Sequence, residues 1–197
     1  MRVFIGFRLP DAIQKQLIAV QEEVKRASLK GSFTDPENFH LTMRFIGAVD
    51  AEEKSAIEAV LARCAEGQAP FLIETAELGN FFKKNKRIIW LGIKENSRLH
   101  QLYDQLNAAL LKQKITVADE VGFIPHLTLG RGIVLSQDWE SLCKVHLPPA
   151  RQMPITALTL FESVRLNGKL VYRPIADFPF AGRKASADQS DSCTETE

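Results

Sequence analysis

The sequence predicts an α+β fold with antiparallel sheets. Segments with strand-like and helix-like patterns are mixed along the 197 residues, without the strict alternation that a doubly wound parallel sheet requires. Two pairs of neighbouring strand-like segments are joined by turn-like sequences, which favours hairpins. In addition, His-Leu-Thr occurs at residues 40–42 and again at residues 126–128. A repeat of this kind indicates an internal duplication, with one lobe around each copy.

The chain begins with a strand followed by a helix. Residues 3–7 form a short and nearly continuous apolar run, which is typical of a buried strand. Pro10 and Asp11 then open a segment in which apolar residues recur at helical spacing, namely Ile13, Leu17, Val20 and Val24. We therefore expect a strand and then an amphipathic helix.

Two further helices are predicted in the first two thirds of the chain. One starts at Asp50, where Glu53 three residues later gives a capping-box pattern, and stops at Gly67. The other starts at Ser97 and carries leucines at helical spacing, namely Leu99, Leu102, Leu106 and Leu110. We therefore expect two helices here, each with apolar residues at helical spacing.

Two hairpins complete the predicted elements. Residues 71–78 and 87–93 have strand patterns and follow one another closely. Residues 155–164 and 170–175 are separated by a turn that contains Asn167-Gly168, and Asn-Gly is among the stronger hairpin signals. The C-terminal residues are rich in Ser, Asp, Glu and Thr. We expect a single domain over residues 1–180 and a flexible polar tail over residues 181–197.

Composition and charge favour a soluble, cytoplasmic protein, which we expect to be a monomer. Twenty-five Lys and Arg against twenty-four Asp and Glu leave a formal charge of +1, so an anionic ligand must be held by a local site. No stretch approaches the roughly 18 apolar residues of a membrane span, and no signal-peptide apolar region builds up near the N-terminus. The cysteines are odd in number and widely spaced, which favours reduced thiols, at Cys64, Cys143 and Cys193.

The spacing within each repeat brings two polar side chains to one face. In a strand, residues i and i+2 point the same way, so His40 lies beside Thr42 and His126 beside Thr128. The intervening Leu and the flanking apolar residues then point into a core. If two lobes face each other, the four polar groups converge in one cleft.

Two histidines across a cleft suit phosphodiester chemistry. One neutral imidazole can take a proton from the nucleophile, while one imidazolium gives a proton to the leaving oxygen. The threonine hydroxyls can hydrogen-bond the phosphate oxygens. Neither motif has the Cys or carboxylate ligands usual beside His in metal sites, so we expect neither a metal nor a cofactor. A single His-x-Thr would be a weak signal, because the pattern arises often by chance.

The paired motifs also carry a family resemblance. His40-Leu41-Thr42-Met43 and His126-Leu127-Thr128-Leu129 resemble the double signature of the 2H phosphoesterase superfamily. Residues 2–6, residues 38–47 and Phe161-Glu162-Ser163 resemble its bacterial RNA 2′,3′-cyclic phosphodiesterase branch, long called the 2′-5′ RNA ligase family. The resemblance covers about residues 1–180.

This resemblance implies a bilobal fold with a central cleft, and hydrolysis of RNA 2′,3′-cyclic phosphate ends to 2′-phosphomonoesters. It implies that His126 activates the attacking water and that His40 protonates the leaving 3′ oxygen. Thr42, Thr128 and Arg131 would bind the phosphate. Three alternatives stay open: 2′-5′ ligation of RNA ends, hydrolysis of a small cyclic nucleotide, and an RNA-end-binding module without turnover.

Strand alternation alone does not place Arg131 beside the histidines. Counted from Thr128, it puts Gly130 in the cleft and Arg131 on the opposite face. Either the strand ends or bulges at Gly130, which glycine permits, or Arg131 is only a surface charge; we favour the bulge. The same alternation places Arg44 on the face of His40 and Thr42.

Several other residues have weaker claims on function. His100 and His146 are expected to be surface or packing residues. The basic run over residues 83–87 is a solvated turn, unless its hairpin overhangs the cleft and holds RNA phosphates. Three aromatic residues could stack a terminal base, although core packing is the usual role of such residues, namely Phe45, Phe123 and Tyr172.

Overall fold

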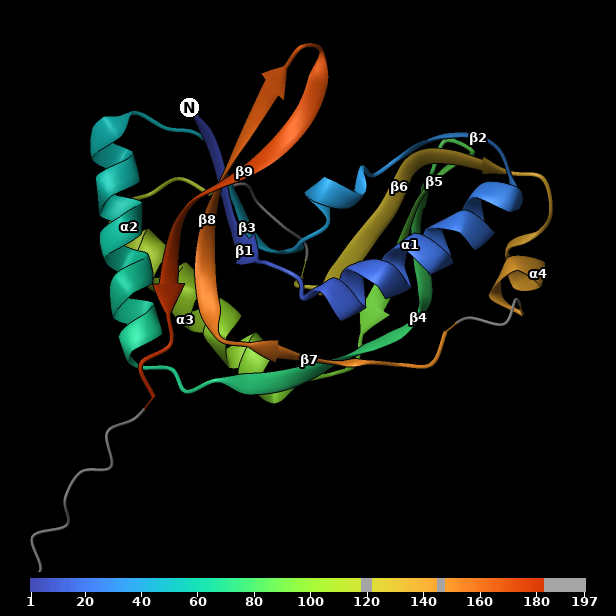
Figure 1. Ribbon diagram of the computed structural model, residues 1–197. Coiled ribbons are helices and arrows are strands. Elements are labelled where there is room, and N and C mark those ends of the chain that lie inside the picture. Colours follow the sequence, from blue (N-terminus) through green and yellow to red (C-terminus); the bar gives the residue numbers. More distant parts are fainter. Residues whose placement is uncertain (118–121, 145–147, 183–197) are drawn as a thin grey trace, which may run out of the picture.

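The computed structural model describes residues 1–117, 122–144 and 148–182, and within these ranges the chain forms two antiparallel sheets with helices (Figure 1). The first sheet has the order β3-β1-β8-β9. Its strands are Leu41–Ala48 (β3), Arg2–Phe7 (β1), Ala157–Leu166 (β8) and Lys169–Pro179 (β9). This arrangement confirms the predicted α+β class with two lobes.

The second sheet has the order β2-β6-β5-β4-β7. Its strands are Ser28–Phe33 (β2), His126–Leu135 (β6), Lys86–Ile93 (β5), Phe71–Lys83 (β4) and Gln152–Ile155 (β7). Each His-Leu-Thr copy therefore belongs to a different sheet, the first at the start of β3 and the second at the start of β6. The two lobes bring the two copies to one place.

The helices divide between the two sheets. Helices α2 (Ala51–Glu66) and α3 (Ser97–Lys112) contact each other and lie beside the first sheet, whereas α1 (Asp11–Arg26) lies against β6 and β2 of the second (Figure 1). The remaining helices are short, a 3-10 turn at Pro36–Asn38 (η1) and α4 at Trp139–Cys143. None of the described helices is long and apolar enough to cross a membrane.

The chain passes repeatedly between the lobes. Strand β1 belongs to the first sheet, the next helix α1 covers the second, and β3 returns to the first. The lobes are therefore not consecutive halves of the sequence. The longest-range pairing joins β1 to β8, where Val3 lies opposite Glu162.

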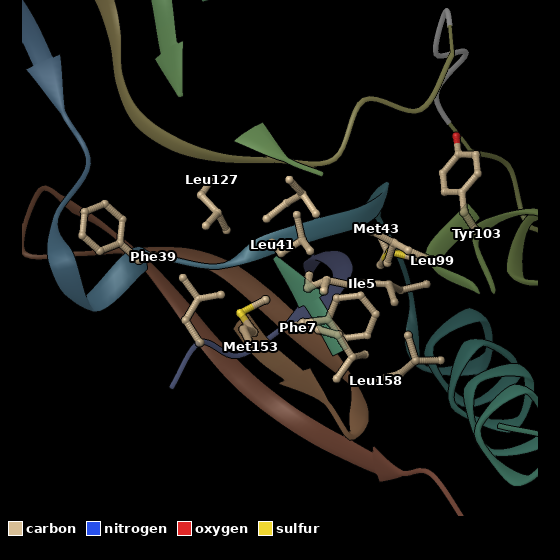
Figure 2. Close-up of a cluster of buried hydrophobic side chains, with 14 of the residues drawn as sticks. Ile5, Phe7, Phe39, Leu41, Met43, Leu99, Tyr103, Leu127, Met153 and Leu158 are labelled. Carbon is tan, nitrogen blue, oxygen red and sulfur yellow. The ribbon is translucent and has the colours of Figure 1, made fainter. Parts of the chain in front are cut away.

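One hydrophobic cluster connects the two lobes behind the histidines. The leucines of the two motifs, Leu41 and Leu127, are fully buried in this cluster together with Phe39 and Met43 (Figure 2). This confirms that the residues alternating with His40 and Thr42 point into a core. The packing fixes the strand ends from which the histidines project.

Local sequence signals explain most element boundaries. Asp50 accepts a hydrogen bond from the Glu53 N–H at 2.8 Å, and the Glu53 carboxylate accepts one from the Asp50 N–H at 3.0 Å, so the predicted capping box is present. Asn167 and Gly168 both have positive φ, at 49° and 79°. This geometry lets the predicted two-residue turn join β8 to β9.

The prediction of one strand over residues 155–164 was wrong. Ile155 ends β7 in the second sheet, and Ala157 begins β8 in the first, so the chain changes sheet at Thr156. Strands β2 and β7 were not predicted. Of the expected tail, residues 183–197 lie outside the described residues, while the Gly182 N–H donates to the Gln68 carbonyl at 2.9 Å.

Candidate active site

His40 is held in one orientation by its own backbone. It lies between η1 and β3, and its Nδ1 is 2.7 Å from the carbonyl oxygen of Asn38. Because a carbonyl only accepts hydrogen bonds, Nδ1 carries a proton and donates it. The other ring nitrogen, Nε2, lies 2.8 Å from the hydroxyl of Thr42. The motif thus places an imidazole and a hydroxyl side by side, as the i and i+2 spacing predicts.

His126 repeats this arrangement in the other lobe. It is the first residue of β6, and its Nδ1 is 2.7 Å from the carbonyl oxygen of Ile124, again the residue two positions earlier. The same donor argument assigns the proton to Nδ1. In both motifs a main-chain carbonyl therefore fixes the ring and leaves Nε2 as the nitrogen that can act on a ligand.

The two rings have different surroundings. The His40 ring lies among three aromatic rings of its own sheet, with centroid distances of 4.7 Å to Phe4, 4.9 Å to Tyr172 and 5.9 Å to Phe161. The His126 ring contacts Phe81 at 5.2 Å and Trp90 at 5.6 Å, both from the second sheet. Each lobe supplies its own aromatic wall for its histidine.

The aromatic wall changes the acidity of His40. Burial lowers the pKa of His40 from 6.5 to about 4, because the charged imidazolium loses hydration. The hydrogen bond to the Asn38 carbonyl opposes this shift in pKa, while the positive charges of Arg131 and His126 reinforce it. These charge effects also indicate that Arg131 and both histidines share one site.

A bulge brings Arg131 into that site. Ile89 and Trp90 are consecutive in β5, but their partners in β6, Gly130 and Thr128, are two residues apart. The extra residue interrupts the alternation, so the bulge expected at Gly130 is present. Arg131 consequently lines the cleft together with Thr128, on the side predicted for a ligand contact.

Two adjoining pockets form the cleft, and Thr128 and Arg131 line both of them. The first, which we call the lysine pocket, has a volume of about 360 Å³ and includes Asp35, Asn38, His40, Lys169 and Tyr172. The second, the phenylalanine pocket, has a volume of about 250 Å³ and includes Thr42, Phe45, Phe81, Phe123 and His126. One histidine opens on each pocket, and the polar groups shared between the pockets lie between them.

The placement predicted for Arg44 was wrong. Ile5 pairs with Arg44 but Gly6 pairs with Thr42, so Met43 is an extra residue in β3 and the alternation shifts there. Arg44 is buried instead, and its Nη1 donates to the Tyr103 hydroxyl at 2.8 Å. Phe45 takes the place in the cleft wall that alternation gives to Arg44.

The other candidate residues from the sequence either line the pockets or pack elsewhere. The three predicted aromatic residues all line the pockets, and His100 packs on Phe123 with a centroid distance of 5.4 Å without lining either. His146 lies outside the described residues. In the basic run, Arg87 packs over the rings of Phe82 and Trp139, and neither pocket includes residues 84–87.

Four contributors to the site were not predicted. Phe81 and Trp90 pack against His126, Lys169 lines one pocket, and Asn38 links η1 to β9. The Asn38 side chain donates to the Leu170 carbonyl and accepts from the Tyr172 N–H, both at 2.8 Å. An Asn two residues before His40 was the only sequence signal for this link. Among the described residues, no three His, Cys, Asp or Glu side chains gather as a metal site.

The sequence of the chain is similar to those of known proteins. Residues 7–90 match the family model of LigT-like phosphoesterases. Relatives named RNA 2′,3′-cyclic phosphodiesterase include one from Thermotoga maritima, 27% identical over 92% of this chain and 97% of its own. Another, from Methanocaldococcus jannaschii, is 30% identical over 66% of this chain and 71% of its own.

Solved structures show the same fold. A Thermus thermophilus protein superimposes with a TM-score of 0.75 over 93% of this chain and all of its own, at 23% identity. Escherichia coli LigT without ligand superimposes with a TM-score of 0.69 over 90% of this chain and 96% of its own, at 26% identity. The chain therefore belongs to the LigT-like phosphoesterases of the 2H superfamily.

Proposed function

We propose that this protein hydrolyses RNA 2′,3′-cyclic phosphate ends to 2′-phosphomonoesters, with His40 and His126 as the acid and base and without a metal ion. One observation carries the proposal. Both histidines donate Nδ1–H to the carbonyl two residues earlier, at 2.7 Å in each lobe, so each keeps Nε2 for proton transfer. The names of the relatives, RNA 2′,3′-cyclic phosphodiesterases, support the substrate.

In the proposed step, Nε2 of His126 accepts a proton from water as the water oxygen bonds to phosphorus. The bond from phosphorus to O3′ breaks, and O3′ takes a proton from Nε2 of His40. The phosphate remains on O2′. Thr42, Thr128 and Arg131 bind the non-bridging oxygens, and the bonds from Arg131 strengthen as charge builds up on them in the transition state.

The low pKa of His40 fits the role of acid once substrate is bound. Two of its causes are the positive charges of Arg131 and His126, and the negative charge of a phosphodiester opposes both. Binding therefore raises the pKa of His40 and favours its protonation.

The test uses a short RNA with a 2′,3′-cyclic phosphate, incubated with EDTA, and determines the position of the product phosphate. We expect a 2′-phosphate, and turnover about 10²- to 10⁴-fold lower in His40→Ala and His126→Ala. An aryl phosphodiester whose leaving group needs no proton separates the roles, because it should restore the rate of His40→Ala but not of His126→Ala. Full activity of either variant on the RNA, or a requirement for metal, would refute the mechanism.

A further inference from the structure

The two pockets differ in chemistry. Apart from the groups of the reacting centre, the phenylalanine pocket is apolar, with Phe45, Phe81, Phe123 and Ile124 in its wall. Three of these side chains are well exposed, Phe45 at 40%, Phe81 at 37% and Ile124 at 50%. Large apolar side chains left exposed around one hollow mark a surface that a flat, apolar ligand group covers.

The lysine pocket has more polar side chains than the phenylalanine pocket, and among its described residues two cations outnumber one carboxylate. Arg131 and Lys169 both line it, and neither forms an ion pair with any described residue. Its one carboxylate, that of Asp35, already accepts a hydrogen bond from the Glu37 N–H at 3.1 Å. A second phosphate, beyond the one that reacts, is the ligand group that such a wall suits.

The reaction geometry links each pocket to one end of the nucleotide. The attacking water and the leaving O3′ lie on opposite sides of phosphorus. The RNA chain continues from C4′, next to C3′ and its oxygen, so it leaves the site on the side of His40. The base is attached to C1′, next to C2′, and lies nearer the water and His126. His40 lines the lysine pocket and His126 the phenylalanine pocket.

From these observations, and resting on the proposed function, we propose that the two pockets bind opposite ends of the terminal nucleotide. The phenylalanine pocket stacks the terminal base. Outside the reacting centre, its described residues offer aromatic and aliphatic side chains and no polar side chain that could read a base edge, so all four bases are accepted. The lysine pocket binds the phosphate that joins the penultimate nucleotide, through Lys169. The preferred substrate is therefore an RNA chain of any end sequence rather than a mononucleotide.

The first experiment compares a nucleoside 2′,3′-cyclic phosphate with a dinucleotide that ends in the same group. We expect a higher kcat/KM for the dinucleotide, by about tenfold at low salt and by less at high salt. Lys169→Gln should abolish this advantage and leave the mononucleotide unchanged. The matched control is Lys15→Gln, which removes one positive charge from the exposed side of α1 and should change neither rate.

The second experiment tests the base pocket with a dinucleotide whose terminal ribose lacks its base. Phe45→Leu should lower kcat/KM about tenfold for the complete substrate, because a leucine has no ring to stack on, and should not affect the abasic one. Phe82→Leu removes a more exposed ring from outside both pockets and serves as the control. The four terminal bases should give similar kcat/KM values.

If a pocket variant loses kcat/KM equally on both substrates of its pair, or loses none, the assignment of that pocket is overturned. If the unmodified protein hydrolyses none of these substrates, the proposed function fails instead. Affinities of the same RNAs then decide the pocket assignment, since Lys169→Gln must still weaken binding of the dinucleotide alone.

Discussion

His40 should make the protein sensitive to acid, and replacing it should remove that sensitivity. In the unfolded chain a histidine titrates near 6.5, whereas in the folded protein the pKa of His40 is about 4. Between these values the unfolded state binds the extra proton, so stability falls as the pH falls from about 6.5 to about 4. Above 6.5 both states are neutral, and this group has no effect on the pH dependence of stability.

The size of the effect follows from the shift. Each pKa unit corresponds to about 1.4 kcal/mol, so the full displacement is worth roughly 3 kcal/mol of unfolding free energy. That is a substantial part of the stability of a typical domain. The glutamine of His40→Gln does not titrate in this range, so the variant should lose less stability on acidification than the unmodified protein.

Urea unfolding, followed by tryptophan fluorescence at several pH values from about 7 to about 4, measures this difference. The carboxylates are common to both proteins and cancel when the two free energies are subtracted. The unfolding free energy of His40→Gln minus that of the unmodified protein should rise by roughly 3 kcal/mol as the pH falls. His100→Gln, at a histidine that lines neither pocket, controls for the loss of one imidazole. A difference that stays constant over this range would refute the argument from burial.

Three further substitutions test the architecture around the histidines. Arg131→Lys should lower kcat/KM about tenfold, because lysine keeps the charge but loses the forked geometry; steady-state kinetics on the cyclic phosphate measures this, and an unchanged value would contradict it. Asn38→Asp sets a carboxylate against the Leu170 carbonyl and should cost about 1–3 kcal/mol in urea unfolding; unchanged stability would show that this link is dispensable. Gly79→Ala puts a Cβ 2.0 Å from the Trp90 ring and should reduce both stability, by about 1–3 kcal/mol, and turnover; wild-type behaviour would mean that the ring moves freely.

The sequence predicted the histidine pair because its signal is local and repeated. The i and i+2 spacing of each motif is a property of one strand, and it needs no knowledge of which strands pair. The bulge that admits Arg131 could also be anticipated, since Gly130 permits it. By contrast, the bulge at Met43 has no glycine and no other local signal, so the position of Arg44 could not be predicted by alternation.

The other features that the sequence did not predict depend on contacts between distant segments. Strand β2 is polar and largely exposed, and pairing with β6 alone makes it a strand. Phe81 and Phe82 are adjacent in β4, and only the assembled lobes decide which of them faces His126. Lys169 is likewise brought to the cleft by a hairpin whose placement depends on tertiary pairing.

The pairing of β1 with β8 has a consequence for synthesis of the chain. Strand β1 is made first, yet its second neighbour in the sheet begins at Ala157, so its edge stays open until late in translation. Phe161 in β8 and Tyr172 in β9, whose rings pack around the ring of His40, are also synthesised late. A chain released before β8 and β9 are made therefore leaves the ring of His40 more hydrated than in the complete fold. Only a chain synthesised past Tyr172 can complete the aromatic surroundings of the His40 ring.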